Sequence, residues 1–469
     1  MKRKAYDELL KWKSREGKRP LIVLGCRQIG KTHLVKEFGK NEYEVCIYMN
    51  FADNASDRVL FEGDLNADSL LERIVLSRNV EIVPGRTLMI LDEIQDCDNA
   101  YYSLKSLAMD SRIDVISTGS FLGVVLNTRK CNGEDEHRVS PMGYAEFLYM
   151  HPMDFEEFCW AMGTNPELIP HVTKSLKTKE PIDTVFNKVL DDLFRRYVVV
   201  GGMPASVEAY SRTRDYTESM RELDMILGIL RLDVSRYSPR KDIMRISACM
   251  DSIPSQLADD KKSFRYSDIE KIKGVGKREY GSSIDWLINA GVVLKCNNLL
   301  SVDPPLDMNM EEDTFKLYLC DTGLMMALCG YRDVQSIITG DPFVNNGVLM
   351  ENAVACALHA KGYPLFYHAK KNSTLEVDFV MKYEDGVCII EVKSGASKRS
   401  KSLNTLLAEP NRNRMGYKVC EGNVSTDVNK AIHIPLYGPW LFDEPSIPEV
   451  PPMDMECINA MLIEKMNGS

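Results

Sequence analysis

One short stretch near the N-terminus restricts the folds open to this chain more than any other. Residues 20–24 (PLIVL) form an apolar run, as expected for a buried parallel strand, and helical apolar spacing follows from residue 33 to 38. Between them lies a G-x-x-x-x-G-K-[ST] pattern in the strand–loop–helix context of a phosphate-binding loop. We therefore expect an α/β domain with a parallel sheet. The eight loop residues are Gly25, Cys26, Arg27, Gln28, Ile29, Gly30, Lys31 and Thr32.

The residue types in this loop suit a nucleoside triphosphate, and we expect ATP and Mg²⁺ as the cofactors. Gly25 and Gly30 permit backbone angles that bring consecutive N–H groups around a phosphate, beside the positive end of the following helix. Lys31 would reach the β- and γ-phosphates, and the hydroxyl of Thr32 would bind the Mg²⁺. The loop residues together are the predicted nucleotide-binding residues.

An acidic strand end further along the chain completes the predicted site. Residues 87–93 (TLMILDE) form a second apolar strand pattern, which we expect on a strand neighbouring the first. Asp92 would hold the Mg²⁺, and Glu93 would orient and polarise the attacking water. Lys31 and Glu93 are therefore the predicted catalytic residues of an ATPase.

Two more residues are candidates for sensing or stabilising the γ-phosphate. A third strand pattern at residues 114–120 ends in hydroxyl residues, the last of which is Ser120. Arg138, beyond this strand, is a candidate cationic finger for the transition state. The alternative for Arg138 is an ordinary exposed arginine.

The middle of the chain shows helical packing patterns and then a different organisation from about residue 264 to 320. A short helix at 267–272, a second helix beginning at Ser282 or Ser283, and a following hairpin predict a winged-helix arrangement. The alternative is a packing domain with a solvated basic loop. The basic residues around the turn, where such modules meet phosphates, are Lys271, Lys273, Lys277 and Arg278.

Residues 375–393 form two strand patterns, which predict a β-hairpin near the C-terminus. A two-residue turn at Asp385–Gly386 would place Asp378 opposite Lys393. Because side chains alternate across a strand, the apolar residues would share one face, which would be the core face. The other face would gather Asp378, Glu391 and Lys393.

An apolar helix pattern at residues 348–358 carries one carboxylate, Glu351, whose burial without a partner would cost several kcal/mol. Together with Asp378 and Glu391 it would bind Mg²⁺ at a phosphodiesterase site, where Lys393 would orient water or stabilise developing charge. Asp378, Glu391 and Lys393 are accordingly candidate catalytic residues, and the three carboxylates are candidate metal ligands. The alternative is a charged hairpin face with an internal salt bridge.

Composition narrows the classes of partner. A net charge of −10 and a pI of about 5.4 argue against a protein whose surface is largely a basic nucleic-acid-binding surface. A local basic groove is compatible with these values. The 13 cysteines include no Cys-x-x-Cys pair, so we expect reduced thiols and no zinc site. The chain has neither a run of about 20 apolar residues nor a signal-peptide pattern. We expect a cytoplasmic protein without a membrane partner.

In the order of its motifs, the chain resembles prokaryotic AAA-type ATPases that join a P-loop domain to a winged helix and a restriction-endonuclease-like domain of unknown function. The resemblance extends to about residue 405. It implies a PD-(D/E)xK pattern at Glu351, Asp378, Glu391 and Lys393, and His137–Arg138 stands where such ATPases often carry Gly-Arg. The matching stretches include GCRQIGKT, ILDEIQ, STGS, MDFEEF, GGMP, SIPSQL, FKLYLCDTGL, EVDF and IEVKSG.

These observations leave two functions open. The first is Mg²⁺-dependent ATP hydrolysis coupled to binding or cleavage of nucleic acid, with DNA as the candidate partner. The second is a nucleotide-controlled switch or scaffold whose nuclease-like domain binds DNA or a protein without cleaving; a homo-oligomer or a protein partner fits both. The expected regions are a P-loop AAA-type ATPase domain (1–165), a helical linker (166–235), a winged-helix-like domain (236–335), a PD-(D/E)xK nuclease-like domain (336–440) and an extended proline-rich tail (441–469).

Overall fold

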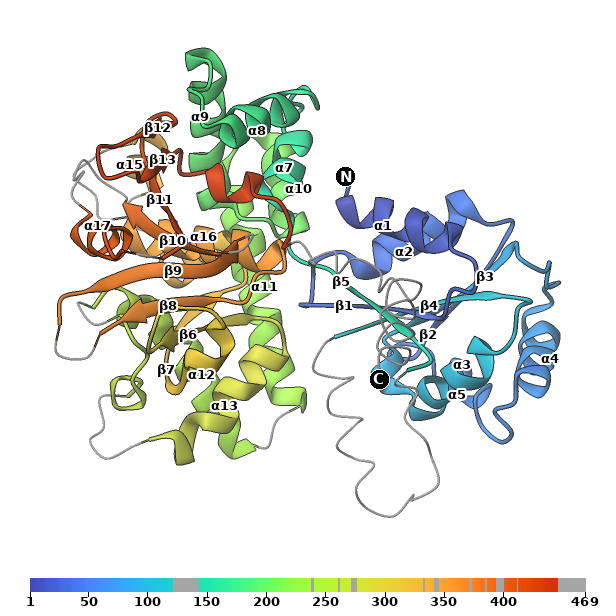
Figure 1. Cartoon of the computed structure of the whole chain (residues 1–469). Helices are drawn as coiled ribbons and strands as arrows, with labels where there is room; N and C mark the ends of the chain where they lie inside the picture. Colours follow the sequence, from blue (N-terminus) through green and yellow to red (C-terminus); the bar gives the residue numbers. More distant parts are fainter. Residues whose placement is uncertain are drawn as a thin grey trace, which may run out of the picture.

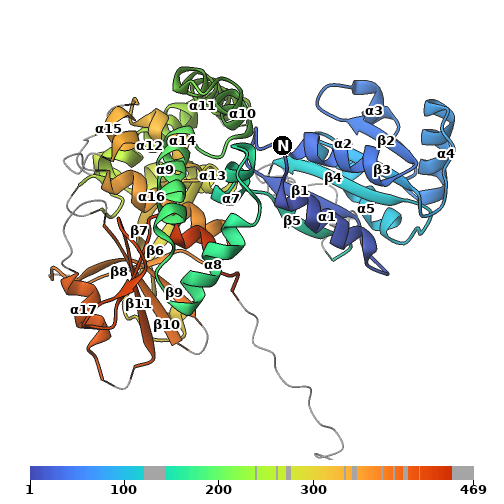
Figure 2. The same cartoon turned by 90° about the horizontal axis from the view of Figure 1, so that it is seen from above.

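The chain folds into two units that lie side by side (Figure 1; Figure 2). The smaller N-terminal unit is α/β, and the larger unit combines a helical layer with a mixed sheet. Strand β5 (Glu146–Tyr149) is the last strand of the smaller unit, and the chain passes from it into the larger one. The computed structural model describes residues 1–120, 143–237, 240–259, 262–270, 276–331, 334–340, 346–370, 373–383, 386–393, 400–410 and 412–445.

The N-terminal unit is built on a five-stranded sheet with the order β2-β3-β4-β1-β5, and all four pairings are parallel. Parallel strands are covered on both faces, which explains their continuous apolar runs. Strand β3 is buried throughout. The other strands are β1 (Leu21–Gly25), β2 (Val45–Asn50), β3 (Thr87–Asp92) and β4 (Asp114–Ser120).

This sheet confirms the predicted parallel α/β domain and corrects one detail of it. Strand β4 lies between β1 and β3, so the acidic strand is not the immediate neighbour of the strand before the loop. The carboxyl ends of parallel strands nevertheless share one edge of a sheet. Asp92 at the end of β3 therefore still meets the phosphate-binding loop at the end of β1.

Helices cover both faces of this sheet (Figure 2). On one face α1 and α2 share a core with Val23 and Ile90. On the other face α4 and α5 share a core with Ile22 and Met89, the residues that point the opposite way in the same strands. The helices are α1 (Lys4–Ser14), α2 (Lys31–Glu42), α3 (Ala55–Val59), α4 (Ala67–Arg78) and α5 (Asp98–Ala108).

The larger unit contains an eight-stranded mixed sheet with the order β12-β13-β11-β10-β9-β8-β6-β7. The β9–β10 and β6–β7 pairs are antiparallel hairpins, whereas β10–β11 and β6–β8 are parallel. The strands are β6 (Val293–Leu299), β7 (Met310–Leu319), β8 (Phe366–Ala369), β9 (Glu376–Tyr383), β10 (Gly386–Lys393), β11 (Arg414–Cys420), β12 (Ser425–Thr426) and β13 (Ile432–Ile434).

Helix α16 contacts β6, β7 and β10, and α17 contacts β9, β10 and β11 with a separate apolar cluster. In the described part of the chain, no helix combines the length and the apolar character needed to span a membrane. The helices of this unit are α7 (Phe155–Ala161), α8 (Leu168–Thr178), α9 (Thr184–Val200), α10 (Pro204–Thr213), α11 (Tyr216–Tyr237), α12 (Arg240–Leu257), α13 (Lys277–Asn289), α14 (Thr322–Leu328), α15 (Val334–Thr339), α16 (Gly347–Ala360) and α17 (Lys401–Leu407).

The region expected to form a winged helix differs in detail from its sequence pattern. In the described part of the first predicted helix, only a 3₁₀ turn at Tyr266–Asp268 forms, and residues 271–275 lie outside the described chain. Helix α13 begins at Lys277, earlier than predicted, because the Glu279 carboxylate accepts a hydrogen bond from Gly276 N–H at 2.9 Å. The following β6–β7 hairpin continues through β8 into the sheet of the C-terminal region.

Candidate nucleotide site and C-terminal carboxylate cluster

The phosphate-binding loop has the backbone that its glycines predict. Gly25 leaves β1 where a Cβ atom would lie only 2.2 Å from the carbonyl oxygen of Met150. Gln28 and Gly30 adopt left-handed φ values of 64° and 87°. Alternation of right- and left-handed residues directs successive N–H groups towards one point and forms a concave anion site. The loop then enters α2 at Lys31, whose helix start adds its own N–H groups.

Lys31 lies folded against its own loop. Its Nζ donates to the carbonyl oxygens of Gly25 and Cys26 at 2.9 and 2.7 Å. Burial lowers the pKa of Lys31 from its ordinary value, against the opposing effect of Glu93. These carbonyls are neutral acceptors, so phosphate oxygens would be the stronger partners for the same ammonium group.

Three neutral hydroxyl groups hold the buried carboxylate of Asp92. Thr32 Oγ1 donates to Asp92 Oδ1 at 2.9 Å, and Tyr48 OH donates to Oδ2 at 2.7 Å. Thr118 on β4 also donates to Oδ1. The structure thus brings Thr32 and Asp92 together, as the sequence predicts. A carboxylate and a hydroxyl at this position fit Mg²⁺, which prefers hard oxygen ligands.

The predicted catalytic Glu93 follows Asp92 in a left-handed conformation with φ 55°. Gln95 donates to its carboxylate, and Glu93 N–H donates to Thr118 Oγ1 at 3.3 Å. Thr118 therefore contacts both acidic residues, whereas the sequence predicted that hydroxyl residues at the end of this strand would sense the γ-phosphate. The side chain of Ser120 lies outside the described part of the structure, as does all of Arg138.

A groove of about 1140 Å³ opens beside these groups and is large enough for a nucleotide. The loop, helix α2 and Glu93 all contribute to its lining. Among the lining residues are Arg27, Gln28, Gly30, Lys31, Thr32, His33, Lys36, Tyr48 and Glu93.

Charged contacts join the loop to the larger unit. Arg27 Nε lies 2.8 Å from Asp233 Oδ2 on α11. Arg3 donates to the carbonyl oxygen of Ile29 at 2.8 Å, and its Nε lies 3.1 Å from Glu157 Oε2 on α7. Sequence reasoning missed Asp233 because it lies some 200 positions away from the loop, within an ordinary amphipathic helix. The loop therefore contacts both the nucleotide groove and the helical layer.

The C-terminal hairpin forms, but its register differs by two residues from the predicted one. Gly386 pairs with Tyr383 and Ile390 pairs with Phe379, so Glu384 and Asp385, which lie outside the described chain, connect the strands. In this register Asp378 falls opposite Glu391, and its predicted position opposite Lys393 is wrong. A shift of two residues leaves every side chain on its own face, so Asp378 and Glu391 still share one.

Lysines from other elements neutralise these carboxylates. Lys316 on β7 is fully buried, and its Nζ lies 3.1 Å from Glu351 Oε1 and 2.9 Å from Glu376 Oε1. Lys262 bridges Glu351 and Asp378, lying 3.2 Å from Asp378 Oδ1. Burial alone would lower the pKa values of both lysines, but the surrounding carboxylates outweigh it and raise them.

Glu351 accepts one more hydrogen bond, from Tyr318 OH at 2.5 Å. Asp378 also accepts from Val392 N–H at 2.8 Å. Burial raises the pKa of Asp378, but Lys262 and Lys316 outweigh it and hold the value below its ordinary range. This partner set explains how an apolar helix accommodates Glu351.

Glu391 lies beside Lys393, with Nζ 2.7 Å from Oε1, and its buried Oε2 accepts no hydrogen bond from the residues that the structure describes. Across the described residues, no three His, Cys, Asp or Glu side chains are placed to hold a metal ion. Lys262 lies where a cation bridging Glu351 and Asp378 would lie. In this arrangement the cluster does not fit the Mg²⁺ site that the sequence predicts.

The predicted basic turn is described only in part. Lys277 is exposed and lies 2.8 Å from Asp313 Oδ1, and Arg278 is exposed beside it. Lys271 and Lys273 lie outside the described residues. The two described residues give a modest basic surface at the start of α13.

Three regions of the chain match protein families. Residues 17–159 match the family described as an AAA domain. Residues 191–335 and 346–437 match two families described as domains of unknown function, DUF8612 and DUF4143. Among curated proteins, none matches the chain significantly.

Several solved structures resemble the chain at low identity. A Walker-type ATPase of Pyrococcus abyssi is 14% identical with a TM-score of 0.39, covering 70% of this chain and 95% of its own. The ORC1 protein of Aeropyrum pernix in complex with DNA is 17% identical with a TM-score of 0.29, covering 72% and 92%. The RuvB Holliday junction branch migration motor of Thermotoga maritima is 12% identical with a TM-score of 0.28, covering 62% and 89%. At these values the likenesses do not extend to function.

The family match covers the unit that carries the loop, Asp92 and Glu93. Its parallel sheet and the geometry of its loop agree with that match. The N-terminal unit of this chain is similar to AAA domains over residues 17–159 and has a parallel sheet with a phosphate-binding loop.

Proposed function

We propose that this protein is an ATP-dependent switch, in which Mg²⁺-dependent binding and hydrolysis of ATP change how the N-terminal unit docks on the larger unit. The observation that carries the proposal is the ion pair between Arg27, inside the phosphate-binding loop, and Asp233 on α11. The lysine-neutralised C-terminal cluster also favours a switch over a cleaving enzyme, because its carboxylates already have cationic partners.

Different residues of the nucleotide site would serve different steps of ATP hydrolysis. Lys31 would exchange its carbonyl partners for the β- and γ-phosphates, and the loop N–H groups would bind the β-phosphate. Thr32 and Asp92 would hold the Mg²⁺, which neutralises charge on the phosphates. Glu93 would orient the attacking water, with Gln95 and Thr118 fixing its position. All of these residues belong to the N-terminal unit.

Coupling would follow from competition for Arg27. Bound phosphates would bring several negative charges to the loop and attract its guanidinium, and Asp233 would be repelled by the same charges. A partly buried pair of this kind contributes on the order of 1–3 kcal/mol, which matches a typical coupling free energy between two sites. Nucleotide binding would therefore loosen this contact between the units, and release of the products would restore it.

Hydrogen exchange along α11 tests this proposal. We expect a non-hydrolysable ATP analogue to raise exchange in the α11 segment around Asp233 in the wild type. The Asp233→Asn variant should show raised exchange without nucleotide and little further change with it. Asp251→Asn is the matched control, since Asp251 forms an exposed ion pair with Arg231 of α11, in which Oδ1 lies 2.9 Å from the guanidinium. Hydrogen exchange in wild-type α11 that does not change when the ATP analogue binds would contradict the switch.

A second candidate function, action on nucleic acid, is favoured by one observation. Next to Asp378, Glu391 has a buried carboxylate oxygen that no described residue hydrogen-bonds, as expected of a nuclease-like site that lacks its ligand. We propose that a winged-helix-like surface at Arg278 and a nuclease-like C-terminal domain would serve this function. It requires Lys262 to leave Glu351 and Asp378 first.

Wild type and Lys262→Ala, incubated with Mn²⁺ and single- or double-stranded DNA and RNA, distinguish the two candidates. Metal binding by calorimetry and cleavage in Lys262→Ala, both lost on adding Asp378→Ala, would support the nuclease. Neither activity in either protein would leave the switch as the function.

A further inference from the structure

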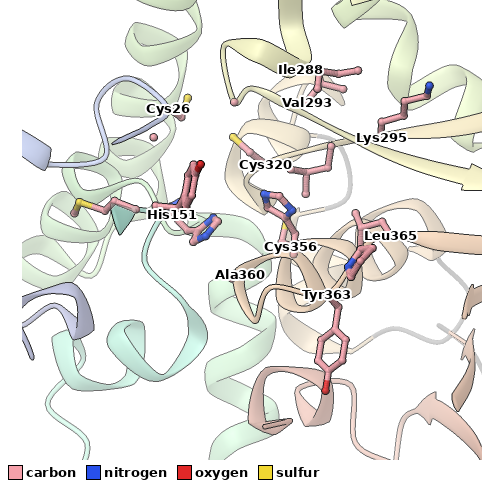
Figure 3. A pocket seen from close by; sticks show the side chains of 18 of the residues that line it. Cys26, His151, Ile288, Val293, Lys295, Cys320, Cys356, Ala360, Tyr363 and Leu365 are labelled. Carbon is pink, nitrogen blue, oxygen red and sulfur yellow. The ribbon is translucent and has the colours of Figure 1, made fainter. Parts of the chain in front are cut away.

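A cavity of about 590 Å³ lies between the two units, directly behind the phosphate-binding loop (Figure 3). Its walls are mainly apolar, and three cysteines line it: Cys26 from the loop, Cys320 after β7, and Cys356 from α16. Figure 3 shows Cys26 and Cys320 entering the same cavity from different units. The nucleotide chemistry described above uses none of these thiols.

Backbone contacts place Cys320 against Cys26. Gly291 packs so closely on the loop that a Cβ atom there would lie 3.4 Å from Cys26 N. Cys320 N–H donates to the carbonyl oxygen of Val292, the residue after Gly291, at 2.9 Å. Asp321 fixes this end of β7 by accepting from Gly202 N–H at 2.6 Å.

We propose that Cys26 and Cys320 form an oxidation site, at which a small peroxide converts the two thiols into a disulfide that ties the phosphate-binding loop to the larger unit. Cys26 would attack one peroxide oxygen, giving a sulfenic acid and releasing water. Cys320 would then displace the second water and form the S–S bond. One hydrogen peroxide is reduced to two waters as the two thiols lose two electrons and two protons.

The surroundings of Cys26 suit it to be the first nucleophile. The hydrogen bond from Cys320 and the nearby ammonium of Lys31 lower the pKa of Cys26, against the opposing effect of burial. The thiolate is the reactive form of cysteine, and Cys26 lines the cavity that a small peroxide would have to enter. Cys356 is engaged elsewhere, since its thiol donates to the carbonyl oxygen of Leu319 at 3.2 Å.

The disulfide would also affect the nucleotide site, and this consequence rests on the switch proposed above. Lys31 donates to the carbonyl of Cys26, and Arg27 follows it, so a covalent bond at Cys26 would hold the loop against β7. We expect oxidation to lower the ATPase rate about tenfold, within the usual range of coupling between sites, and a reductant to restore it.

The experiment treats the full-length protein with hydrogen peroxide, maps disulfides by differential alkylation and mass spectrometry, and measures phosphate release. A Cys26–Cys320 peptide in the wild type and in Cys356→Ser, absent from Cys320→Ser, supports the proposal. Absence of that peptide from the wild type, or pairing of Cys26 with Cys356, overturns it. A disulfide that forms without any effect on ATP hydrolysis supports the oxidation site and contradicts the switch, so the two failures are distinguishable.

Discussion

The nucleotide site and the C-terminal cluster each place a buried lysine near buried carboxylates, but the lysines have different partners. Lys31 donates to backbone carbonyls, while hydroxyl groups hold Asp92. Lys316 instead forms direct ion pairs with Glu351 and Glu376. The pKa of Lys31 is accordingly lowered by burial, whereas that of Lys316 is raised by its carboxylates despite burial.

This difference separates a site prepared for a ligand from one that is already satisfied. Neutral partners leave the charges of Lys31 and Asp92 available for phosphate and for a divalent cation. A buried ion pair uses both charges internally, and removing one partner leaves the other unpaired at high cost. A buried lysine near carboxylates therefore indicates ligand binding at the nucleotide site and a stabilising role in the C-terminal cluster.

The largest effect should come from Glu93→Gln. We expect hydrolysis to fall by about 10²–10⁴-fold, because the neutral amide cannot polarise water, while ATP affinity stays unchanged. Phosphate release and calorimetry measure the two quantities. Glu62→Gln, an exposed carboxylate in the same unit, is the control. Hydrolysis at the parental rate in Glu93→Gln would remove this residue from the mechanism.

Lys316→Met tests the satisfied site. Removing this buried cation takes one ion-pair partner from each of Glu351 and Glu376, and we expect the free energy of unfolding to fall by about 3–5 kcal/mol. Lys277→Met, which removes an exposed pair with Asp313, should cost much less, because exposed ion pairs contribute little to stability. Urea denaturation measures both. Equal losses in the two variants would show that the cluster is not a structural centre.

The same substitution at the loop, Lys31→Met, should give the reverse profile. We expect ATP affinity to fall by about 1.5–3 kcal/mol, or roughly 10- to 150-fold, because a charged hydrogen bond to phosphate is lost. The free energy of unfolding should change by less than about 1 kcal/mol, since neutral partners hold Lys31 in the folded chain. Calorimetry and urea denaturation together check the pair of outcomes. A large fall in the free energy of unfolding of Lys31→Met would show that Lys31, like Lys316, mainly stabilises the fold.

Alkaline pH should give the smallest effects, with opposite signs at the two lysines. The raised pKa of Lys316 gives stability that is complete below 10.5 and is lost as pH rises through the folded value. The lowered pKa of Lys31 means that the unfolded chain binds more protons below 10.5, so its contribution rises with pH. Urea midpoints measured from neutral pH to about pH 11 test both contributions. The loss of stability that Lys316 causes in the wild type should be absent from Lys316→Met, and the gain that Lys31 causes should be absent from Lys31→Met.

Sequence patterns predicted the elements around the phosphate-binding loop because these parts are local. The strand, the loop and the helix start are contiguous, and the run ending at Asp92 marks the second strand. Sheet order could not be read in the same way, and β4 separates β1 from β3. The partners of Asp92 on other strands, Tyr48 and Thr118, were missed for the same reason.

At the C-terminal hairpin, alternation predicted the shared face of Asp378 and Glu391 although the turn was misplaced. The counter-charges come from Lys262 and Lys316, far away in the sequence, and no local pattern connects them to Glu351. A signal for Lys316 did exist. It stands alone as a charge among apolar residues in FKLYL, which is the same argument that singled out Glu351.

Because β6 pairs with β8, the middle and C-terminal regions share one sheet. This pairing limits where the chain can be divided into fragments. A fragment ending before residue 346 would keep β6 and β7 and lose the strand that covers one side of β6. The exposed edge would offer unpaired N–H and C=O groups to other chains and invite aggregation. Fragments for expression should therefore keep residues 262–445 together, and insertions between β7 and β8 should be tolerated better than cuts.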